Sequence, residues 1–451
     1  MPGWTTLENL IREEIVERRE EGCDPVGFEE RVAACGGDEQ QLMAVYADLC
    51  KLTVHPDFPY DEPNELADIL ALATKDFPDT PAPLTGEALR NKLYGAWLGR
   101  CIGCALGKPF ECGPYVCGNE KGAGWEHVIR WFKGADAYPI NGYAPAHSAA
   151  EAEGLSLICE QSQRENISFM ETDDDIRYLV VGLMLNERYG GDFTPEQVCD
   201  LWMSTLPAYQ CCTAERQAYV NFLRTENNDI SNRRDYIRTH LNPYREWIGA
   251  QIRADHFGYV HAGYPLAAAK TAYNDAAFTH VKNGIYGEMF MAAVIAAAFT
   301  ESDPERCVEA GLSVIPTTSR LYADIRKAIA LAHKAESEEA LYASLWAEFG
   351  HYSWVHTNNN AAACAAVLIY GKGDFTRTVA AAVTCGWDTD CNGATVGSIM
   401  GALCGADAIP EHWKAHLNDT LYSLIPGFHP IAISECADRS AAVYRRLHPA
   451  E

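Results

Sequence analysis

Apolar residues recur along most of the chain with the three- and four-residue spacing of amphipathic helices. Residues 7–20 are strongly charged but carry aliphatic side chains, from Leu7 to Ile15, at helical spacing. Residues 285–300 are apolar nearly all round, which predicts a helix buried in the core. No segment shows a convincing two-residue alternation of apolar and polar positions. The pattern therefore predicts an all-α fold.

The same spacing predicts the positions of the individual helices. We expect helices at residues 7–20, 39–52, 65–74, 86–108, 172–185, 195–205, 214–224, 244–253, 265–273, 285–300, 304–311, 320–335, 359–370, 375–384 and 388–405. Residues 227–242 are polar and predict a loop. Residues 76–83 are rich in proline and predict a linker. We accordingly divide the chain into an N-terminal helical layer, residues 1–85, and a main helical domain, residues 86–451.

Two of the predicted helices carry glycine at every fourth position, which places the glycines on one helical face. The first set is Gly95, Gly99, Gly103 and Gly107, and the second is Gly393, Gly397, Gly401 and Gly405. Each glycine inside a helix costs about 1 kcal/mol relative to alanine. The simplest explanation is that both helices lie at the centre of the molecule against close neighbours, and each is a candidate neighbour for the other.

Composition restricts the classes of partner. The 451 residues include 36 Lys and Arg against 62 Asp and Glu, a net charge of −26. Such a charge argues against nucleic acid or an anionic membrane as a general surface partner. The N-terminal residues show no signal-peptide pattern, and no apolar run is long enough to span a membrane. The 17 scattered cysteines are typical of free thiols in a reducing cytoplasm. The oligomeric state stays open.

Acidic residues gather at two predicted helix starts. Thr172 is followed by Asp173, Asp174 and Asp175, and a Gly-rich turn carries Asp388 and Asp390. One or two acids after a threonine are explained by helix capping and the helix dipole. Three successive carboxylates before a buried helix repel one another unless a cation neutralises them. Oxygen ligands without histidine favour Mg²⁺, Mn²⁺ or Ca²⁺, and shared carboxylates suit two ions.

Three segments, taken together, resemble the ADP-ribosylglycohydrolase family, which includes the dinitrogenase reductase-activating glycohydrolases. They are Gly-Ala-Trp-Leu-Gly-Arg-Cys-Ile-Gly-Cys-Ala-Leu-Gly-Lys-Pro-Phe-Glu at 95–111, Thr-Asp-Asp-Asp at 172–175, and Gly-Trp-Asp-Thr-Asp-Cys-Asn at 386–392. The resemblance covers roughly residues 86–440. It implies that residues 86–451 form a catalytic domain with a compact orthogonal helical bundle and a binuclear Mg²⁺ centre. The N-terminal layer is additional to that bundle.

The resemblance also implies roles for individual residues. The metal-binding positions would be Thr172, Asp173, Asp174, Asp388, Asp390 and Cys391. Asp173 or Asp174 would remove a proton from the attacking water, and Glu111 would belong to the catalytic cleft. We expect Trp387, Asn359 and Tyr143 to bind substrate. The reaction would be hydrolysis of an N- or O-glycosidic bond at the anomeric carbon of an ADP-ribosyl or related ribosyl compound, either small or attached to a protein.

Departures from the family pattern leave other functions open. Cys391 stands where threonine is usual, and a thiol is a poor ligand for Mg²⁺. Asp175 stands where threonine is common, Cys104 where aspartate is frequent, and Trp387 in place of a glycine. ADP-ribosyl-arginine should therefore not be assumed as the substrate. The alternatives are a hydrolase of small nucleoside-type ribosides, a catalytically weak or non-enzymatic relative resembling the lens crystallins of this fold, and a Ca²⁺-stabilised structural protein.

Residues 112–154 form a long segment that is rich in glycine, proline and aromatic side chains. Long loops that are not disordered are commonly functional, so we expect this segment to fold over the substrate cleft. If the substrate carries phosphate groups, we expect Lys121, Arg130 or Lys133 to contact them. If the substrate is an uncharged riboside, we expect the aromatic residues Trp125, Tyr138 and Tyr143 to matter instead.

Overall fold

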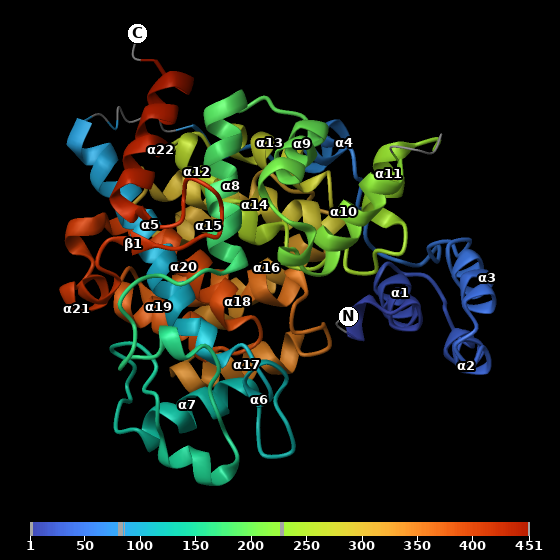
Figure 1. Ribbon diagram of the computed structural model, residues 1–451, viewed down its shortest axis with the longest axis horizontal. Helices are drawn as coiled ribbons and strands as arrows, with labels where there is room; N and C mark the ends of the chain where they lie inside the picture. The colour runs from blue at the N-terminus through green and yellow to red at the C-terminus, as the bar shows by residue number, and fades with distance from the viewer. Residues whose placement is uncertain (1–2, 80–83, 85, 226–229, 450–451) are drawn as a thin grey trace.

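The computed structural model describes residues 3–79, 84, 86–225 and 230–449, and within them the chain is almost entirely helical. The described residues form 22 α-helices, arranged as a compact body with a smaller projecting layer (Figure 1). The strands in the described residues form one short antiparallel pair, β1 (Thr420–Leu421) with β2 (Ile431–Ala432). The predicted all-α fold is therefore confirmed. No helix within the described ranges is long and apolar enough to cross a membrane.

The helices have the following bounds. The N-terminal region contains α1 (Leu7–Glu20), α2 (Phe28–Ala34), α3 (Glu39–Leu49) and α4 (Leu66–Leu72). Next along the chain are α5 (Gly86–Gly107), α6 (Pro114–Cys117), α7 (Gly124–Gly134), α8 (Asp174–Tyr189), α9 (Pro195–Thr205), α10 (Thr213–Thr225), α11 (Arg233–Thr239) and α12 (Asp255–Val260). The remainder are α13 (Pro265–Ala276), α14 (Lys282–Ala298), α15 (Pro304–Leu312), α16 (Arg320–Lys334), α17 (Glu338–Phe349), α18 (Thr357–Gly371), α19 (Phe375–Thr384), α20 (Thr389–Cys404), α21 (Glu411–Lys414) and α22 (Ile433–Leu447).

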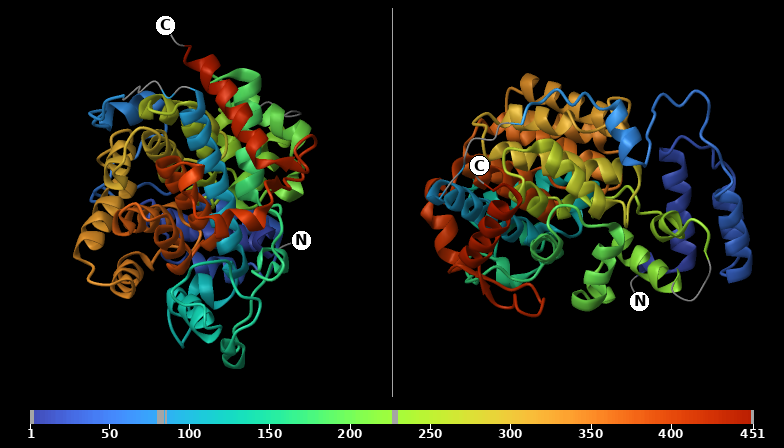
Figure 2. Two further views of the ribbon diagram at one scale, coloured as in Figure 1. Left: turned by 90° about the vertical axis from the view of Figure 1, so that its left-hand side faces the viewer. Right: turned by 90° about the horizontal axis from the view of Figure 1, so that it is seen from above.

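Helices α1 to α3 form the layer that projects from one side of the body (Figures 1 and 2). They share a small hydrophobic cluster that also includes Ala214, Leu241 and Tyr244 of the main body. Helix α4 lies apart from this layer, and its Ile69 packs in the main core. The predicted linker at 76–83 and the boundary at residue 85 fall partly outside the described residues, at 80–83 and 85. The layer is thus tied to the body through buried apolar contacts.

The two glycine-striped helices, α5 and α20, lie against each other in antiparallel directions. Gly95 meets Gly401, Gly99 meets Gly397, and Gly103 meets Gly393. A Cβ atom added at any of these glycines would lie closer than 3.0 Å to backbone atoms of the facing helix. The predicted close approach of the two helices is confirmed, because only bare backbone fits between them. The C-terminal end of α5 consequently reaches the N-terminal start of α20.

Several sequence expectations are corrected by the structure. Residues 244–250 form turns instead of a helix, because the Ile248 amide donates to the Val355 carbonyl at 2.8 Å and Trp247 bridges to His356. The segment 112–154 is not irregular throughout, since α7 buries its apolar side against the main core. The expected loop at 227–242 contains α11. The 17 cysteines, all within the described ranges, are free thiols as predicted.

Candidate metal centre

The antiparallel pair places the predicted acidic segments at one end of the molecule's central helices. Helix α5 ends at Gly107, and Glu111 follows one short turn later. Helix α20 begins after Asp388, and the Thr389 hydroxyl donates to the Gly107 carbonyl at 3.0 Å. The start of α8, where Asp173 is the N-cap residue, lies beside them. Three distant segments of the chain thus meet at one site.

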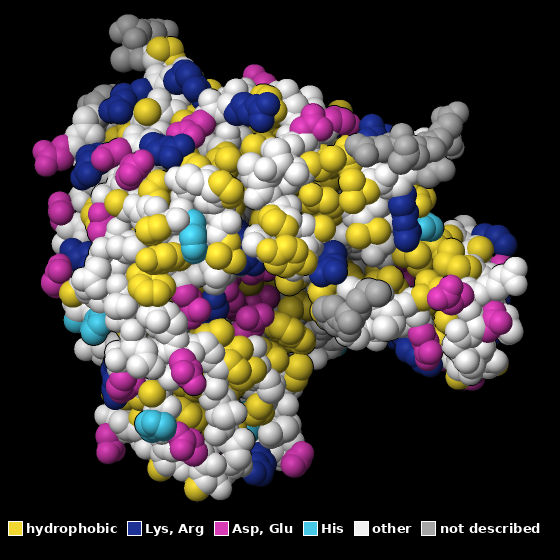
Figure 3. Space-filling view, viewed as in Figure 1, with side chains coloured by type: hydrophobic (Ala, Val, Ile, Leu, Met, Phe, Trp, Pro, Cys, Tyr) yellow, Lys and Arg dark blue, Asp and Glu magenta, His cyan; other side chains and the backbone are white. Residues whose placement is uncertain are grey.

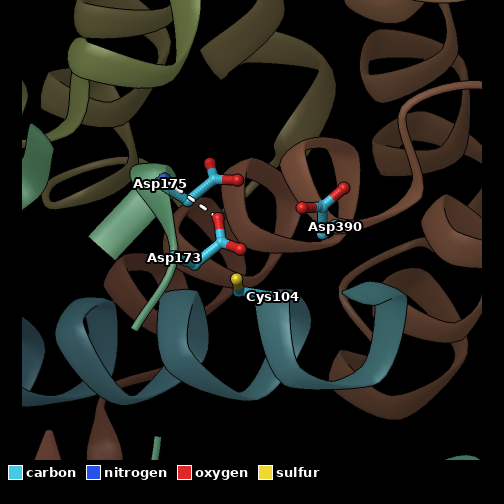
Figure 4. A group of neighbouring side chains, drawn as sticks. All are labelled: Cys104, Asp173, Asp175 and Asp390. Atoms are coloured by element: carbon cyan, nitrogen blue, oxygen red, sulfur yellow. Dashed lines mark hydrogen bonds between the residues drawn. The ribbon is translucent and has the colours of Figure 1, made fainter. Parts of the chain in front are cut away.

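The acids form two groups that share Asp390. One ligand atom from each of Cys104, Asp173, Asp175 and Asp390 lies within 4.8 Å of the others (Figure 4). The second group is Asp388, Asp390 and Cys391. All of these side chains are buried. The two motifs singled out in the sequence are therefore brought together, and Cys104 of α5 joins them.

Three carboxylate oxygens of the two acidic motifs lack a hydrogen-bond partner among the described residues. They are Oδ2 of Asp175, Oδ1 of Asp388 and Oδ1 of Asp390. Buried carboxylate oxygens without a donor carry a large desolvation cost, which a coordinated cation relieves. The oxygen-rich set fits a hard divalent cation such as Mg²⁺ better than a soft one.

Three cationic side chains offset part of the negative charge. Arg100 is fully buried and donates to Asp175 at 2.7 Å and to Asp255 at 2.6 Å. The Lys108 ammonium lies 3.3 Å from a carboxylate oxygen of Asp173. Arg177 donates to the Thr172 hydroxyl at 3.0 Å, which leaves that oxygen a free lone pair. Asp175, which the sequence marked as added negative charge, is thus half of a buried ion pair.

The charge of the centre remains strongly negative after this pairing. Seven carboxylates face Arg100, Lys108 and Arg177, an excess of four negative charges if all are ionised; the seven are Glu111, Asp173, Asp174, Asp175, Asp255, Asp388 and Asp390. A further acid, Glu171, lies 3.5 Å from Lys108 and is more exposed.

Burial and neighbouring charges shift the pKa values of these acids in different directions. Burial would raise the pKa of Asp173, but Lys108 and Arg177 bring it below its ordinary value. Burial and the neighbouring Asp173 raise the pKa of Asp174 to about 7. Burial raises the pKa of Asp390 well above normal, with help from Glu111, and burial and Asp388 do the same for Glu111. Four carboxylates so close together cannot all stay ionised without a cation.

The two thiols of the site are unsuited to hard cations. Burial and nearby aspartates raise the pKa values of both Cys104 and Cys391 well above normal. Both are therefore neutral thiols in the metal-free protein, and a neutral thiol is a weak ligand. The residues that fit Mg²⁺ are the aspartates and Thr172.

A cavity of about 380 Å³ opens beside the acids. Glu111, Asp174, Asp388 and Cys391 line it on one side. Its other lining residues include Trp4, Tyr178, Glu215, Trp247 and Trp354. In Figure 3 acidic side chains gather in a hollow near the middle of the face, bordered by hydrophobic ones. A larger depression of about 650 Å³, around Phe375, includes Tyr138 of the predicted aromatic residues but none of the predicted metal-binding or catalytic residues.

The aromatic wall of this cavity was not predicted from the sequence. Its tryptophans come from the N-terminal segment, from the turn before η6 (Gln251–Arg253) and from the segment before α18. None of them belongs to a motif with recognisable spacing.

The three predicted substrate-binding residues lie elsewhere. Trp387 is buried and stacks on Trp346, with ring centroids 5.1 Å apart and planes at 13°. Its φ of 58° lies in the region that glycine favours, which explains why the family pattern has glycine there. Buried Asn359 donates to the Ser353 carbonyl at 3.1 Å. The hydroxyl of Tyr143, also buried, donates to the Trp413 carbonyl at 2.9 Å. None of the three lines the cavity beside the acids.

Asn360, which the sequence did not single out, supports the acidic turn. Its side-chain oxygen accepts from the Asn392 amide at 2.7 Å and from the backbone N–H of Asp388 at 3.3 Å. The same residue donates to the carbonyls of Trp354 and His356. It therefore connects the aromatic wall of the cavity to the turn that carries Asp388.

The segment 112–154 contributes no residue to the lining of the cavity. Its basic side chains are engaged within the segment: Lys121 donates to the Glu153 carbonyl at 2.8 Å, Arg130 donates to the Lys121 carbonyl at 2.6 Å, and Lys133 lies over the Tyr138 ring. The expectation that this segment forms the cover of the cleft is not supported by the cavity lining.

The comparison with protein-family models agrees with the sequence resemblance. A family model described as ADP-ribosylglycohydrolase matches residues 85–445. Among solved structures, one titled "ADP-ribosylglycohydrolase-related protein complex" superimposes with a TM-score of 0.49 at 18% sequence identity. The superposition covers 80% of this chain and 100% of that one. The search of curated proteins gave no match.

Proposed function

The chain belongs to the ADP-ribosylglycohydrolase family, and we propose that it is a metal-dependent glycoside hydrolase of ADP-ribosyl or related ribosyl compounds. The bond cleaved would be an N- or O-glycosidic bond at the anomeric carbon of the ribosyl group. Family membership supports a glycohydrolase, and the family's name is the source of the ADP-ribosyl suggestion. The site described above supports the metal dependence.

The proposed cofactor is two divalent cations, Mg²⁺ in the first instance with Mn²⁺ or Ca²⁺ as alternatives. Their ligands would be Thr172, Asp173, Asp174, Asp388 and Asp390, with Cys391 at the edge of the second site. The supporting observation is the set of buried carboxylate oxygens without donors on Asp388 and Asp390.

The residues of the cavity can be given roles in hydrolysis. When bound, two divalent cations supply Lewis acidity that fixes sugar hydroxyls and acidifies water. Asp174 lines the cavity and is placed to accept the proton that the attacking water loses. Glu111 lines the same cavity, and its carboxyl group would donate a proton to the leaving group. The tryptophans give the sugar and its substituent an apolar wall from which water is excluded.

Metal binding and hydrolysis in matched variants test this proposal. Asp174→Asn and Asp390→Asn each remove one charge with little change of shape, and Asp200→Asn is the control because Asp200 is exposed on α9. We expect the parent and the control to bind two Mg²⁺ by calorimetry and to hydrolyse at least one conjugate from a panel of ADP-ribosyl compounds and nucleosides. Both site variants should lose at least one ion and lower kcat at least about a hundredfold. Full metal stoichiometry in both site variants would refute the ligand assignment.

A further inference from the structure

A second cavity adjoins the one beside the acids. It measures about 530 Å³ and lies between the N-terminal layer and α10; we call it the outer groove. Its lining includes Trp4, Thr213, Arg216, Arg224, His240 and Tyr244. Trp4 and Thr213 also line the cavity beside the acids, which we call the inner cavity. The two spaces therefore share a wall made of Trp4 and Thr213.

The two spaces differ in charge. The inner cavity is lined by four carboxylates, of Glu111, Asp174, Glu215 and Asp388, and no described residue of its lining is basic. The outer groove is lined by Arg216 and Arg224, with Glu39 as its one acid among the described residues. Burial and Arg224 lower the pKa of His240, so its ring adds no positive charge at neutral pH. In a protein with a net charge of −26, the guanidinium of Arg216 is thus a cationic group beside the acid-lined inner cavity.

Arg216 is available for an anion. Its guanidinium carbon lies 5.8 Å from the centre of the Trp4 ring, and no carboxylate of the described residues pairs with it. By contrast, the buried Arg245, Arg253 and Arg320 each pair with carboxylates. An arginine beside an aromatic face presents its N–H groups in a fork that matches phosphate oxygens.

Trp4 is held in place by the fold. Its carbonyl accepts from the Tyr244 hydroxyl at 2.7 Å, and its ring meets the Tyr244 ring edge-on at 6.3 Å. Tyr244 in turn packs on Trp247 of the inner cavity, with ring centroids 4.4 Å apart. The next helix, α1, is anchored by Arg245, which donates to Glu14 at 2.7 Å and to Glu21 at 2.9 Å. The aromatic wall of both spaces is thus continuous and fixed to the body.

We infer that the outer groove is the anion-binding part of the substrate site, where Arg216 holds the phosphate-bearing portion of a molecule whose ribosyl end lies in the inner cavity. This inference rests on the proposed function, because that function places the ribosyl end over the acids. It gives the N-terminal layer a role in recognition through Trp4. It also moves the expected phosphate contacts from Lys121, Arg130 and Lys133 to α10.

The experiment compares a phosphate-bearing probe with one that lacks phosphate. ADP-ribose and adenosine are titrated calorimetrically into the Mg²⁺-loaded full-length protein, at low and at physiological ionic strength. Arg216→Gln removes the charge and keeps a polar side chain. Arg188→Gln is the matched control, since Arg188 is exposed and also lies over an aromatic ring, 5.1 Å from the centre of Tyr189.

We expect Arg216→Gln to weaken ADP-ribose binding about tenfold more than it weakens adenosine binding, because one charge-assisted contact to phosphate is lost. The difference should shrink at higher ionic strength. With a hydrolysable ADP-ribosyl conjugate, KM should rise more than kcat falls. Trp4→Ala should weaken binding of both probes, because the shared wall is lost.

Equal ADP-ribose affinities for Arg216→Gln and Arg188→Gln would overturn the inference, as would a parent protein that binds adenosine but not ADP-ribose. A parent that binds neither probe overturns it as well. These outcomes are distinct from failure of the proposed function, which is read from the Mg²⁺ stoichiometry and from hydrolysis of any compound in the panel.

Discussion

Gly103→Ala places a methyl group between α5 and α20 at the end of the pair that carries the acids. The added Cβ would lie closer than 3.0 Å to the carbonyl group of Gly393 and to the amide nitrogen of Ala394. These are backbone atoms, which cannot rotate away as a side chain can. The two helices must therefore separate locally by roughly 1 Å or more to accept the methyl group.

The energetic cost follows from two opposing effects. Overpacking of a core costs about 1–3 kcal/mol, and a rigid backbone neighbour favours the upper end of that range. The better helix propensity of alanine returns about 1 kcal/mol. We expect the free energy of unfolding to fall by about 2 kcal/mol, measured by urea denaturation of the metal-free protein.

The same displacement should disturb the acid centre. Cys104 follows Gly103 directly, and a ligand atom of Asp390 lies within 4.8 Å of the Cys104 sulfur. Metal sites require ligand distances within about 0.2 Å of their ideal values, so we expect Mg²⁺ affinity to fall at least about tenfold. Gly95→Ala is the matched variant, because it meets Gly401 in the same way but lies about 12 Å further along α5.

Gly95→Ala should lose similar stability and keep its Mg²⁺ affinity, and Gly142→Ala should change neither, since a Cβ there meets nothing within 4 Å. If Gly103→Ala and Gly95→Ala lower Mg²⁺ affinity equally, the helix contact does not position the acids. If neither variant is less stable than Gly142→Ala, the close backbone contact itself is refuted.

Two further predictions concern single side chains. Burial, together with Glu246, raises the pKa of Glu20 from 4.5 to about 7 despite Arg320. Ionising Glu20 in the folded protein is therefore unfavourable, and the protein loses stability as the pH rises from about 4.5 to 7. In urea denaturation, Glu20→Gln should raise the free energy of unfolding by about 2.5 kcal/mol more at pH 8 than at pH 5. A difference that does not vary with pH would contradict this. Cys391→Thr exchanges a neutral thiol for a hydroxyl, so it should tighten the weaker Mg²⁺ site in a calorimetric titration, and unchanged affinities would mean that the side chain points away from the ions.

Local signals in the sequence were sufficient for much of the fold. Helices α1, α9 and α19 have the predicted bounds, because each begins after a side chain that caps its first turn: Thr6, Thr194 and Asp374. The glycine spacing also predicted the α5–α20 contact, since repeated helix-weakening residues on one face require a structural reason. The helix expected at 244–253 was wrong because a long-range backbone contact, between Ile248 and Val355, takes precedence over local propensity.

The sequence predicted the acids of the candidate site but not its aromatic wall. Its acids lie in two short motifs, so their convergence at Asp173 and Asp390 could be expected, whereas their roles remain predictions. The aromatic wall is made of Trp4, Trp247 and Trp354, which are neighbours only after the N-terminal layer has packed on the body. No spacing along the chain encodes such a contact. Composition alone also gave no reason to pair Arg100 with Asp175 inside the core.

The contact between the end of α5 and the start of α20 joins residues 282 positions apart, as the hydrogen bond from Thr389 to Gly107 records. At about 5–20 residues per second, the ribosome makes α5 roughly 15 seconds or more before it makes α20. During that interval the glycine face of α5 has no partner helix. Asp173 and Asp174 likewise lack Asp388 and Asp390, the other acids of the site. The proposed metal ligands are therefore complete only after Asp390 has been synthesised.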